Sequence, residues 1–155
     1  MSDQVSDLAE RSLALDPVKS FCVTAPAGSG KTELLIQRYL TLLARVEQPQ
    51  EVLAITFTRK AAAEMRSRIG EALALAGDGE RPAGAHSALT YDLARQVLER
   101  DRERGWQLIH GRSQLNIRTI DGFCGALTSQ MPVLSRFGGP VSAVDDAVPY
   151  YREAT

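Results

Sequence analysis

Residues 21–32 read Phe21-Cys22-Val23-Thr24-Ala25-Pro26-Ala27-Gly28-Ser29-Gly30-Lys31-Thr32. The first five residues favour β-structure, and the proline and glycines that follow cannot extend a strand. Residues 31–45 are apolar almost all round, which is typical of a helix packed inside a sheet. The sequence therefore predicts a buried strand over residues 21–25, then a glycine-rich loop, then a central helix over residues 31–45.

The glycine-rich loop matches the P-loop pattern, except that Ala25 stands where the first glycine is usual. Gly28 and Gly30 permit the unusual dihedrals with which backbone N–H groups curl around a β-phosphate at a helix N-terminus. Lys31 is expected to contact the β- and γ-phosphates of ATP, and Thr32 to hold Mg²⁺. The alternative is a surface lysine after a flexible turn. We predict a Mg-ATP site with Lys31 and Thr32 in the catalytic roles and these binding residues: Ala25, Pro26, Ala27, Gly28, Ser29, Gly30, Lys31 and Thr32.

Downstream, strand and helix patterns alternate. Residues 52–57 form a continuous apolar run, the pattern of a parallel strand covered on both faces, and residues 115–120 predict a third, less buried strand. Thr58 can cap the helix that follows the second strand, and Gly105 ends a later one. Amphipathic helices are predicted over residues 5–15 and 60–76, and further helices over residues 87–104 and 121–131. This order is typical of an α/β domain with right-handed crossovers.

Composition excludes several classes of protein. The chain has 155 residues, of which 44% are hydrophobic and 24% charged, so neither a disordered nor a fibrous protein is indicated. Lys and Arg number 18 against 19 acidic residues, so nucleic-acid binding would need a local basic patch. Cys22 and Cys124 lack metal-ligand spacing, and neither a signal-peptide core nor a membrane-spanning run is found. A cytoplasmic protein without a membrane segment is expected.

Two further blocks follow the P-loop. Residues 54–65 read Ala-Ile-Thr-Phe-Thr-Arg-Lys-Ala-Ala-Ala-Glu-Met, and residues 119–123 read Thr-Ile-Asp-Gly-Phe. With the P-loop, these blocks resemble motifs I, Ia and Ic of the UvrD/Rep-type DNA helicases of superfamily one, including the AddA- and RecB-like repair helicase-nucleases. The second block is long enough to be very specific. The resemblance covers at least residues 25–123.

The resemblance implies a P-loop, RecA-like parallel sheet flanked by helices, as an incomplete first helicase lobe. Residues 1–131 would be the amino-terminal part of the ATP-binding lobe, and residues 132–155 an irregular segment leading into the remainder. The implied function is an ATP-dependent, 3′-to-5′ DNA helicase or translocase of repair and recombination. Its implied partners are single-stranded DNA and a nuclease or helicase subunit.

The second and third blocks predict a DNA-binding surface. The second predicted strand ends at Thr56 and Phe57, and ligands of open α/β sheets bind at the carboxyl ends of strands. Hydroxyls and amides would hold a phosphate backbone without reading its sequence, and an aromatic ring could stack on a base. The alternative for both phenylalanines is a place in the core. The predicted DNA-binding residues are Thr56, Phe57, Thr58, Arg59, Lys60, Thr119 and Phe123.

The sequence departs from the family pattern at several positions. Asp121 stands where the family commonly has His, and the usual adenine-reading Gln upstream has no clear counterpart in Gln4 or Arg11. ATP hydrolysis needs an acid for Mg²⁺ on a neighbouring strand, for which Asp121 and the pair Asp145-Asp146 are poor candidates. Nothing resembles the later motifs, the second lobe or a nuclease domain. We therefore expect an amino-terminal fragment that binds Mg-ATP weakly and does not unwind DNA.

Two other functions compete with the helicase. One is a self-contained small P-loop NTPase or kinase that uses Asp121 for magnesium. The other is a non-catalytic nucleotide- or DNA-binding module that needs a partner lobe.

Several charged and aromatic residues are expected to be structural. The alternating charges of residues 99–104 predict a solvated helix face, and Arg66 and Arg68 are expected to be solvated as well. Trp106 is expected to pack half-exposed.

Overall fold

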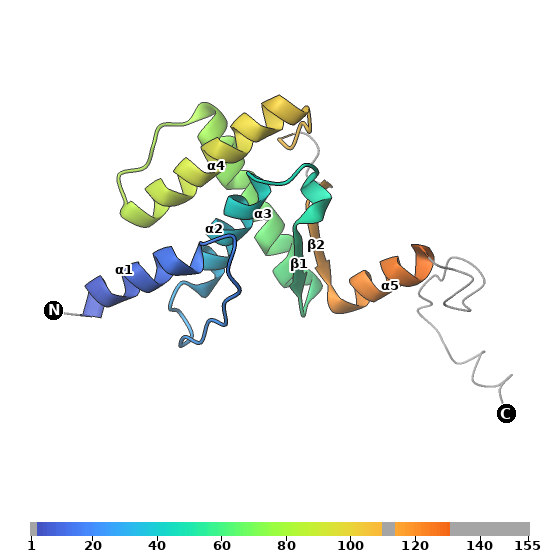
Figure 1. Cartoon of the computed structure of the whole chain (residues 1–155), viewed down its shortest axis with the longest axis horizontal. Coiled ribbons are helices and arrows are strands. Elements are labelled where there is room, and N and C mark those ends of the chain that lie inside the picture. The colour runs from blue at the N-terminus through green and yellow to red at the C-terminus, as the bar shows by residue number, and fades with distance from the viewer. Residues whose placement is uncertain (1–2, 110–113, 131–155) are drawn as a thin grey trace, which may run out of the picture. The chain divides into compact units, whose positions relative to one another are not determined.

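The computed structural model describes residues 3–109 and 114–130, with side chains from Leu8 onward. The chain divides into two compact units, Met1–Thr119 and Ile120–Thr155. Within the described residues it is a mixed α/β structure with five α-helices and a two-stranded sheet (Figure 1). The elements of the first unit are α1 (Asp3–Ala14), α2 (Lys31–Leu43), the 3₁₀ turn η1 (Pro49–Glu51), β1 (Leu53–Thr56), α3 (Arg59–Asp78), α4 (Ala85–Arg104) and β2 (Asn116–Thr119). The second unit contains α5 (Ile120–Gln130).

The predicted helices are all present, each within two residues of its predicted ends. Thr58 is the N-cap of α3, as predicted, because its hydroxyl accepts a hydrogen bond from the N–H of Ala61 at 3.1 Å. Gly105 ends α4 with a φ of 68°, a left-handed conformation that glycine adopts without strain. None of the described helices combines the length and the apolar character needed to cross a membrane.

The sheet pairs β1 and β2 in parallel, with Ala54 opposite Ile117 and Thr56 opposite Thr119. The connection between the two strands contains α3 and α4, as a parallel pair requires. Both strands lie within one residue of the predicted runs. The carboxyl ends of β1 and β2 therefore lie side by side.

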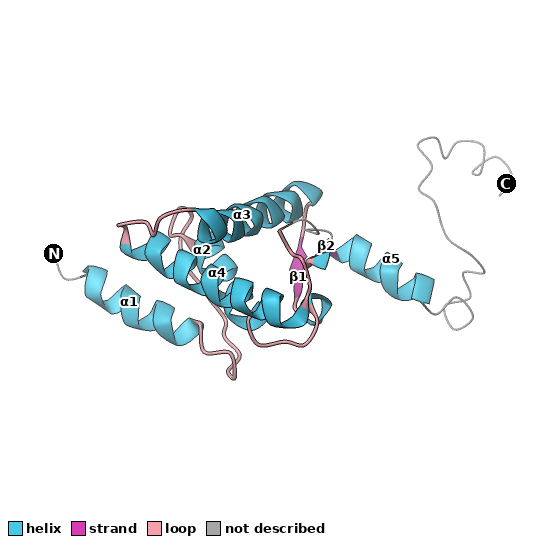
Figure 2. Cartoon of the chain, turned by 90° about the horizontal axis from the view of Figure 1, so that it is seen from above, coloured by secondary structure: helices cyan, strands magenta, loops and turns pink. Residues whose placement is uncertain are grey.

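The strand predicted over residues 21–25 is absent, so that prediction is wrong. Residues 20–26 have no regular structure, and Figure 2 draws the connection between α1 and α2 as a loop. Cys22, Val23 and Thr24 are exposed. A strand needs a neighbour to complete its backbone hydrogen bonds, and within the described residues β1 and β2 pair only with each other. Residues 21–25 have side chains that favour a strand, but no described strand pairs with them to form the backbone hydrogen bonds of a sheet.

The prediction that β1 is covered on both faces is also wrong. Val52 and Ala54 point toward the core, together with the buried Ile117 of β2. Leu53 is 38% exposed and Ile55 is 49% exposed on the opposite face. Within the described residues, helix packing thus covers one face of this sheet.

The core of the first unit lies between α2, α3, α4 and the inner face of the sheet. Each fully buried Leu or Ile side chain contributes about 1.5–3 kcal/mol relative to exposure. α2 is amphipathic rather than apolar all round, because Leu35 is exposed, and it ends at Leu43. The largest fully buried side chains are Ile36, Leu40, Leu43, Pro49, Ile69, Leu73, Val97, Leu108 and Ile117.

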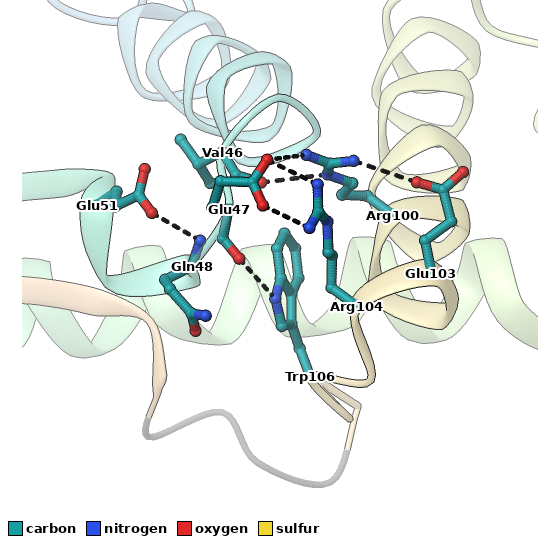
Figure 3. A network of polar contacts seen from close by, with 8 residues as sticks. All are labelled: Val46, Glu47, Gln48, Glu51, Arg100, Glu103, Arg104 and Trp106. Carbon is teal, nitrogen blue, oxygen red and sulfur yellow. Dashed lines mark hydrogen bonds and ion pairs between the residues drawn. The ribbon is translucent and has the colours of Figure 1, made fainter.

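A charged cluster fixes the connection that follows α2 (Figure 3). Glu47 accepts from Arg100 Nη2 at 3.0 Å and from Arg104 Nη2 at 2.6 Å, and the indole N–H of Trp106 donates to its carbonyl at 3.2 Å. Arg100 also donates to the carbonyl of Val46 at 3.1 Å. We call Glu47, Arg100, Arg104 and Trp106 the Glu47 clamp.

The Glu47 clamp corrects two predictions. The charges near the end of α4 are not simply a solvated face, because the Arg100 side chain is only 19% exposed and pairs with Glu47. Trp106 is not half-exposed: it is 6% exposed and belongs to the core. Its indole N–H is satisfied by a main-chain carbonyl, as a buried tryptophan requires.

Candidate functional site

The glycine-rich loop has the backbone conformation that the sequence predicted. Gly28 and Gly30 have φ angles of 79° and 77°, and the N–H of Ser29 closes a turn onto the carbonyl of Pro26 at 3.4 Å. Gly30 is the N-cap of α2, and no side chain caps that helix. The first N–H groups of a helix have no partner within it. They are the groups with which a helix N-terminus binds a phosphate.

Cationic side chains hold the carbonyl groups of this loop. Lys31 Nζ donates to the carbonyl of Ala25 at 2.6 Å and to that of Pro26. From α1, the guanidinium of Arg11 donates to the carbonyl of Ser29. Carbonyl oxygens carry partial negative charge and are bound here by cations. The N–H groups of the loop, which carry partial positive charge, can then donate to an anion.

The loop residues fit a nucleotide phosphate. The hydroxyl oxygen of Ser29 is buried, and it has no hydrogen-bond partner within the described part of the chain. A buried hydroxyl without a partner in a loop of this conformation indicates a missing polar ligand. A cavity of about 280 Å³ adjoins the loop, and its lining includes Arg11, Ser29 and Lys31.

Thr32 is exposed at the start of α2, where its hydroxyl could hold Mg²⁺. No three His, Cys, Asp or Glu side chains gather as a metal site among the described residues.

A second arginine organises the approach to the loop. Arg38 of α2 donates to the carbonyl of Ala14 at 2.6 Å, to that of Asp16 at 3.1 Å and to that of Lys19 at 2.8 Å. Its guanidinium also lies 5.2 Å from the centre of the Phe21 ring. The carbonyls at the end of a helix need such donors, so Arg38 fixes where α1 ends.

The turn after α1 is stabilised by Asp16 and Val18. The N–H of Val18 donates to the Asp16 carboxylate at 3.0 Å. This hydrogen bond is the main reason that the pKa of Asp16 is held below its ordinary value.

The predicted DNA-binding residues of the second block lie at the carboxyl end of β1. Phe57 is 88% exposed, so its ring lies outside the core formed by the described residues. The Thr56 hydroxyl lies 3.1 Å from the carbonyl of Thr58, and Thr56 is the register partner of Thr119. Arg59 and Lys60 are exposed in the first turn of α3. The structure thus brings Thr56 and Thr119 together beside an exposed aromatic ring and two cations.

The remaining predicted site residues lie in the second unit or outside the described residues. Phe123 lies on α5, and Asp121 is exposed in its first turn. Asp145 and Asp146 lie outside the described residues.

Sequence reasoning missed several contacts of the first unit. Arg66 is not solvated as expected: it is half-buried and donates to the carbonyl of Ile117. Arg68 is exposed and pairs with Glu64 at 3.0 Å, as a solvated helix face predicts.

Arg11 and Arg38 bind main-chain carbonyls 18 to 24 residues away in the sequence. The sequence shows that each arginine lies on a helix beside the loop. It does not show which carbonyl the arginine contacts.

A polar chain links the start of α2 to α4. The buried Gln37 donates to the hydroxyl of Thr90 at 3.0 Å, and that hydroxyl lies 2.5 Å from a carboxylate oxygen of Glu33. Glu33 lies in the first turn of α2, so these contacts hold that turn against α4.

The family model described as UvrD/REP helicase N-terminal domain matches residues 8–146. The chain belongs to this family. The UvrD/REP match includes the glycine-rich loop and both blocks of sequence that follow it.

Named relatives agree with the UvrD/REP assignment. DNA helicase II of Escherichia coli is 32% identical over 117 residues, which is 74% of this chain and 16% of that protein. One subunit of the ATP-dependent helicase/nuclease of Clostridium perfringens strain 13 is 42% identical over 119 residues, covering 74% and 8% respectively. ATP-dependent DNA helicase UvrD2 of Mycobacterium tuberculosis H37Rv is 38% identical over 115 residues, covering 68% and 16%.

The chain matches only a minor part of the length of these relatives, between 8% and 16%. No solved structure matches the chain significantly.

Proposed function

We propose that this chain forms the ATP-binding part of a DNA helicase or translocase, with residues 1–131 belonging to a RecA-like ATP-binding lobe. The observation that carries the proposal is the glycine-rich loop before α2, in which Lys31 and Arg11 hold the carbonyls. The buried hydroxyl of Ser29, which has no hydrogen-bond partner among residues 3–109 and 114–130, supports the same conclusion. Membership of the UvrD/REP family supplies the class of reaction.

In the proposed site, the residues of the chain bind and orient the nucleotide. The N–H groups of residues 28–32 would bind the β-phosphate, and Lys31 would exchange its carbonyl partners for phosphate oxygens. The Thr32 hydroxyl would hold Mg²⁺. Bound ATP would supply the phosphoryl group that is transferred to water. Glu33, held through Thr90, keeps the first turn of α2 fixed against α4.

The DNA surface is proposed at the end of β1. Threonine hydroxyls at 56 and 119 and the cations Arg59 and Lys60 would hold phosphates, and Phe57 would stack on a base. The exposure of Phe57 supports this role, because exposing a large apolar ring to water is unfavourable unless a ligand covers it.

The wider activity is proposed from the relatives. One relative is named as a DNA helicase, and another as a subunit of an ATP-dependent helicase/nuclease. From these names we propose helicase activity with a nuclease or helicase partner. Roles in DNA repair and recombination, 3′-to-5′ movement along single-stranded DNA and a cytoplasmic location are proposed from the sequence and its resemblance to the UvrD/Rep-type helicases.

The nucleotide site is tested by measuring Mg-ATP affinity of the purified chain by calorimetry. Lys31→Ala should abolish binding while the chain still folds, because the lysine is the cation placed to neutralise the phosphates. Lys19→Ala is the matched control, since Lys19 is an exposed lysine whose side chain pairs with Asp16. Unchanged affinity in Lys31→Ala would overturn the proposal.

The DNA surface is tested with a fluorescent single-stranded oligonucleotide. Phe57→Leu should weaken binding about tenfold or more, because stacking contributes about 1–3 kcal/mol per base. Phe57→Tyr retains the ring and should bind normally. Equal affinity of the leucine variant and the native chain would remove the stacking role.

A further inference from the structure

The peptide unit between Ser29 and Gly30 is the part of the loop that Arg11 controls. A trans peptide is planar, and its C=O and N–H point in opposite directions. The described residues contain no cis peptide. When the Arg11 guanidinium holds the carbonyl of Ser29, the N–H of Gly30 therefore points to the opposite side of the same plane.

This peptide unit would be free to rotate without such a contact. Gly30 has a φ of 77°, and glycine populates positive and negative φ about equally. Rotation of the unit would exchange the N–H of Gly30 for the carbonyl of Ser29, which would repel a phosphate. An ideal Cβ on Gly30 would lie 3.5 Å from the Arg11 guanidinium nitrogens, so the arginine packs against this unit.

We propose that Arg11 is a positioning residue of the phosphate loop: it fixes the Ser29–Gly30 peptide so that the N–H of Gly30 faces the nucleotide phosphates. The inference rests on the proposed function, since it assigns the N–H groups of the loop to a nucleotide.

The position of Arg11 depends in turn on α2. Arg11 lies in the last turn of α1, and Arg38 holds the carbonyls of Ala14 and Asp16 that follow it. One path of contacts thus runs from α2 through Arg38 to α1, and from Arg11 back to the loop that begins α2. Because coupling between two equilibria is reciprocal, a nucleotide that orders the loop also stabilises the docking of α1.

The first measurement is Mg-ATP and Mg-ADP affinity of the 155-residue chain by calorimetry. Arg11→Ala should weaken both about tenfold, because a hydrogen bond from a charged group contributes on the order of that factor. Arg11→Lys keeps a cationic donor and should recover most of the loss. Ser12→Ala, an exposed change on the same helix, is the matched control and should bind normally.

The second measurement separates positioning from a merely structural role. Nucleotide should slow amide hydrogen exchange in α1 of the native chain, and this protection should disappear in Arg11→Ala while the first turn of α2 stays protected. Equal amide exchange rates in α1 with and without nucleotide would overturn the inference. If Arg11→Ala does not fold, Arg11→Lys takes its place in this assay: it should retain most of the protection of α1, and a complete loss would contradict a role carried by a cationic donor.

Lys31→Ala in the same assays distinguishes the role of Arg11 from the nucleotide site as a whole. If Lys31→Ala loses binding but a folded Arg11→Ala keeps native affinity, the proposed role of Arg11 is wrong and the nucleotide site stands. Native affinity in Lys31→Ala overturns the nucleotide site itself.

Discussion

Both ends of α2 are held by arginines from other helices, but the contacts at the two ends differ in kind. At the amino-terminal end, Arg11 and Lys31 bind main-chain carbonyls, and the Ser29 hydroxyl is left without a described partner. At the carboxyl-terminal end, the Glu47 clamp pairs carboxylate with guanidinium and indole with carbonyl. The first end is the one proposed to bind a nucleotide, whereas the polar groups of the second bind one another. Stability and binding are therefore expected to respond to different mutations.

The largest expected effect on stability comes from the clamp. Trp106→Ala should lower the free energy of unfolding by about 3–5 kcal/mol, because it removes a buried aromatic side chain and leaves a cavity. Denaturant titration measures this change. Nucleotide affinity, corrected for the folded fraction, should stay native. A large loss of affinity in the folded variant would mean that the two ends are not separate.

Arg38→Ala should have an intermediate effect and should act at the loop end. Removing its donors leaves the carbonyls of Ala14, Asp16 and Lys19 without this partner, at a cost of about 2 kcal/mol. Limited proteolysis within residues 15–25 should accelerate. Arg45→Ala, an exposed arginine just beyond α2, is the control. Equal cleavage rates in the two variants would contradict the role of Arg38.

Glu47→Gln should cost less, about 1 kcal/mol. The carboxylate is itself 60% exposed, so solvent and salt screen its attraction to Arg100 and Arg104. The loss should shrink as salt is raised. Glu64→Gln breaks the exposed pair with Arg68 and should cost only a few tenths of a kcal/mol. Equal losses would show that partial burial of Arg100 adds nothing.

Tyr39→Phe should have the smallest effect at neutral pH and a visible one in alkali. Burial raises the pKa of Tyr39 to about 12 from an ordinary value of 10, and its hydroxyl donates to the carbonyl of Val52. Above pH 10 the unfolded chain loses this proton first, so the native protein should lose stability between about pH 10 and 12. Tyr39→Phe should show a smaller loss over that range. Parallel pH profiles of the two proteins would contradict the shifted pKa.

Local patterns predicted the five described α-helices and the glycine-rich loop. The 3.6-residue period located the helices, the hydroxyl of Thr58 predicted a cap, and Gly28 and Gly30 predicted left-handed backbone. These features depend on neighbouring residues along the chain. They therefore leave a signal in the sequence.

Features that depend on distant residues were not predicted. The run over residues 21–25 has strand preference, but the existence of a neighbouring strand is a property of the whole fold. Arg100 and Trp106 bind residues 46 and 47, more than 50 positions away, so their charge and size did not reveal their burial. Phe57 was ambiguous because a phenylalanine after an apolar run suits either a core or a ligand.

The open face of the sheet has a consequence for the protein in solution. Leu53 and Ile55 present aliphatic carbon to water, and Arg118 of β2 stands in register beside Ile55. The guanidinium of Arg118 places a positive charge beside these exposed apolar side chains. Self-association of two chains through this face would bring two such charges together, which is electrostatically unfavourable. We therefore expect Arg118→Ala to lower the solubility of the purified chain, although the formal net charge changes by only one unit.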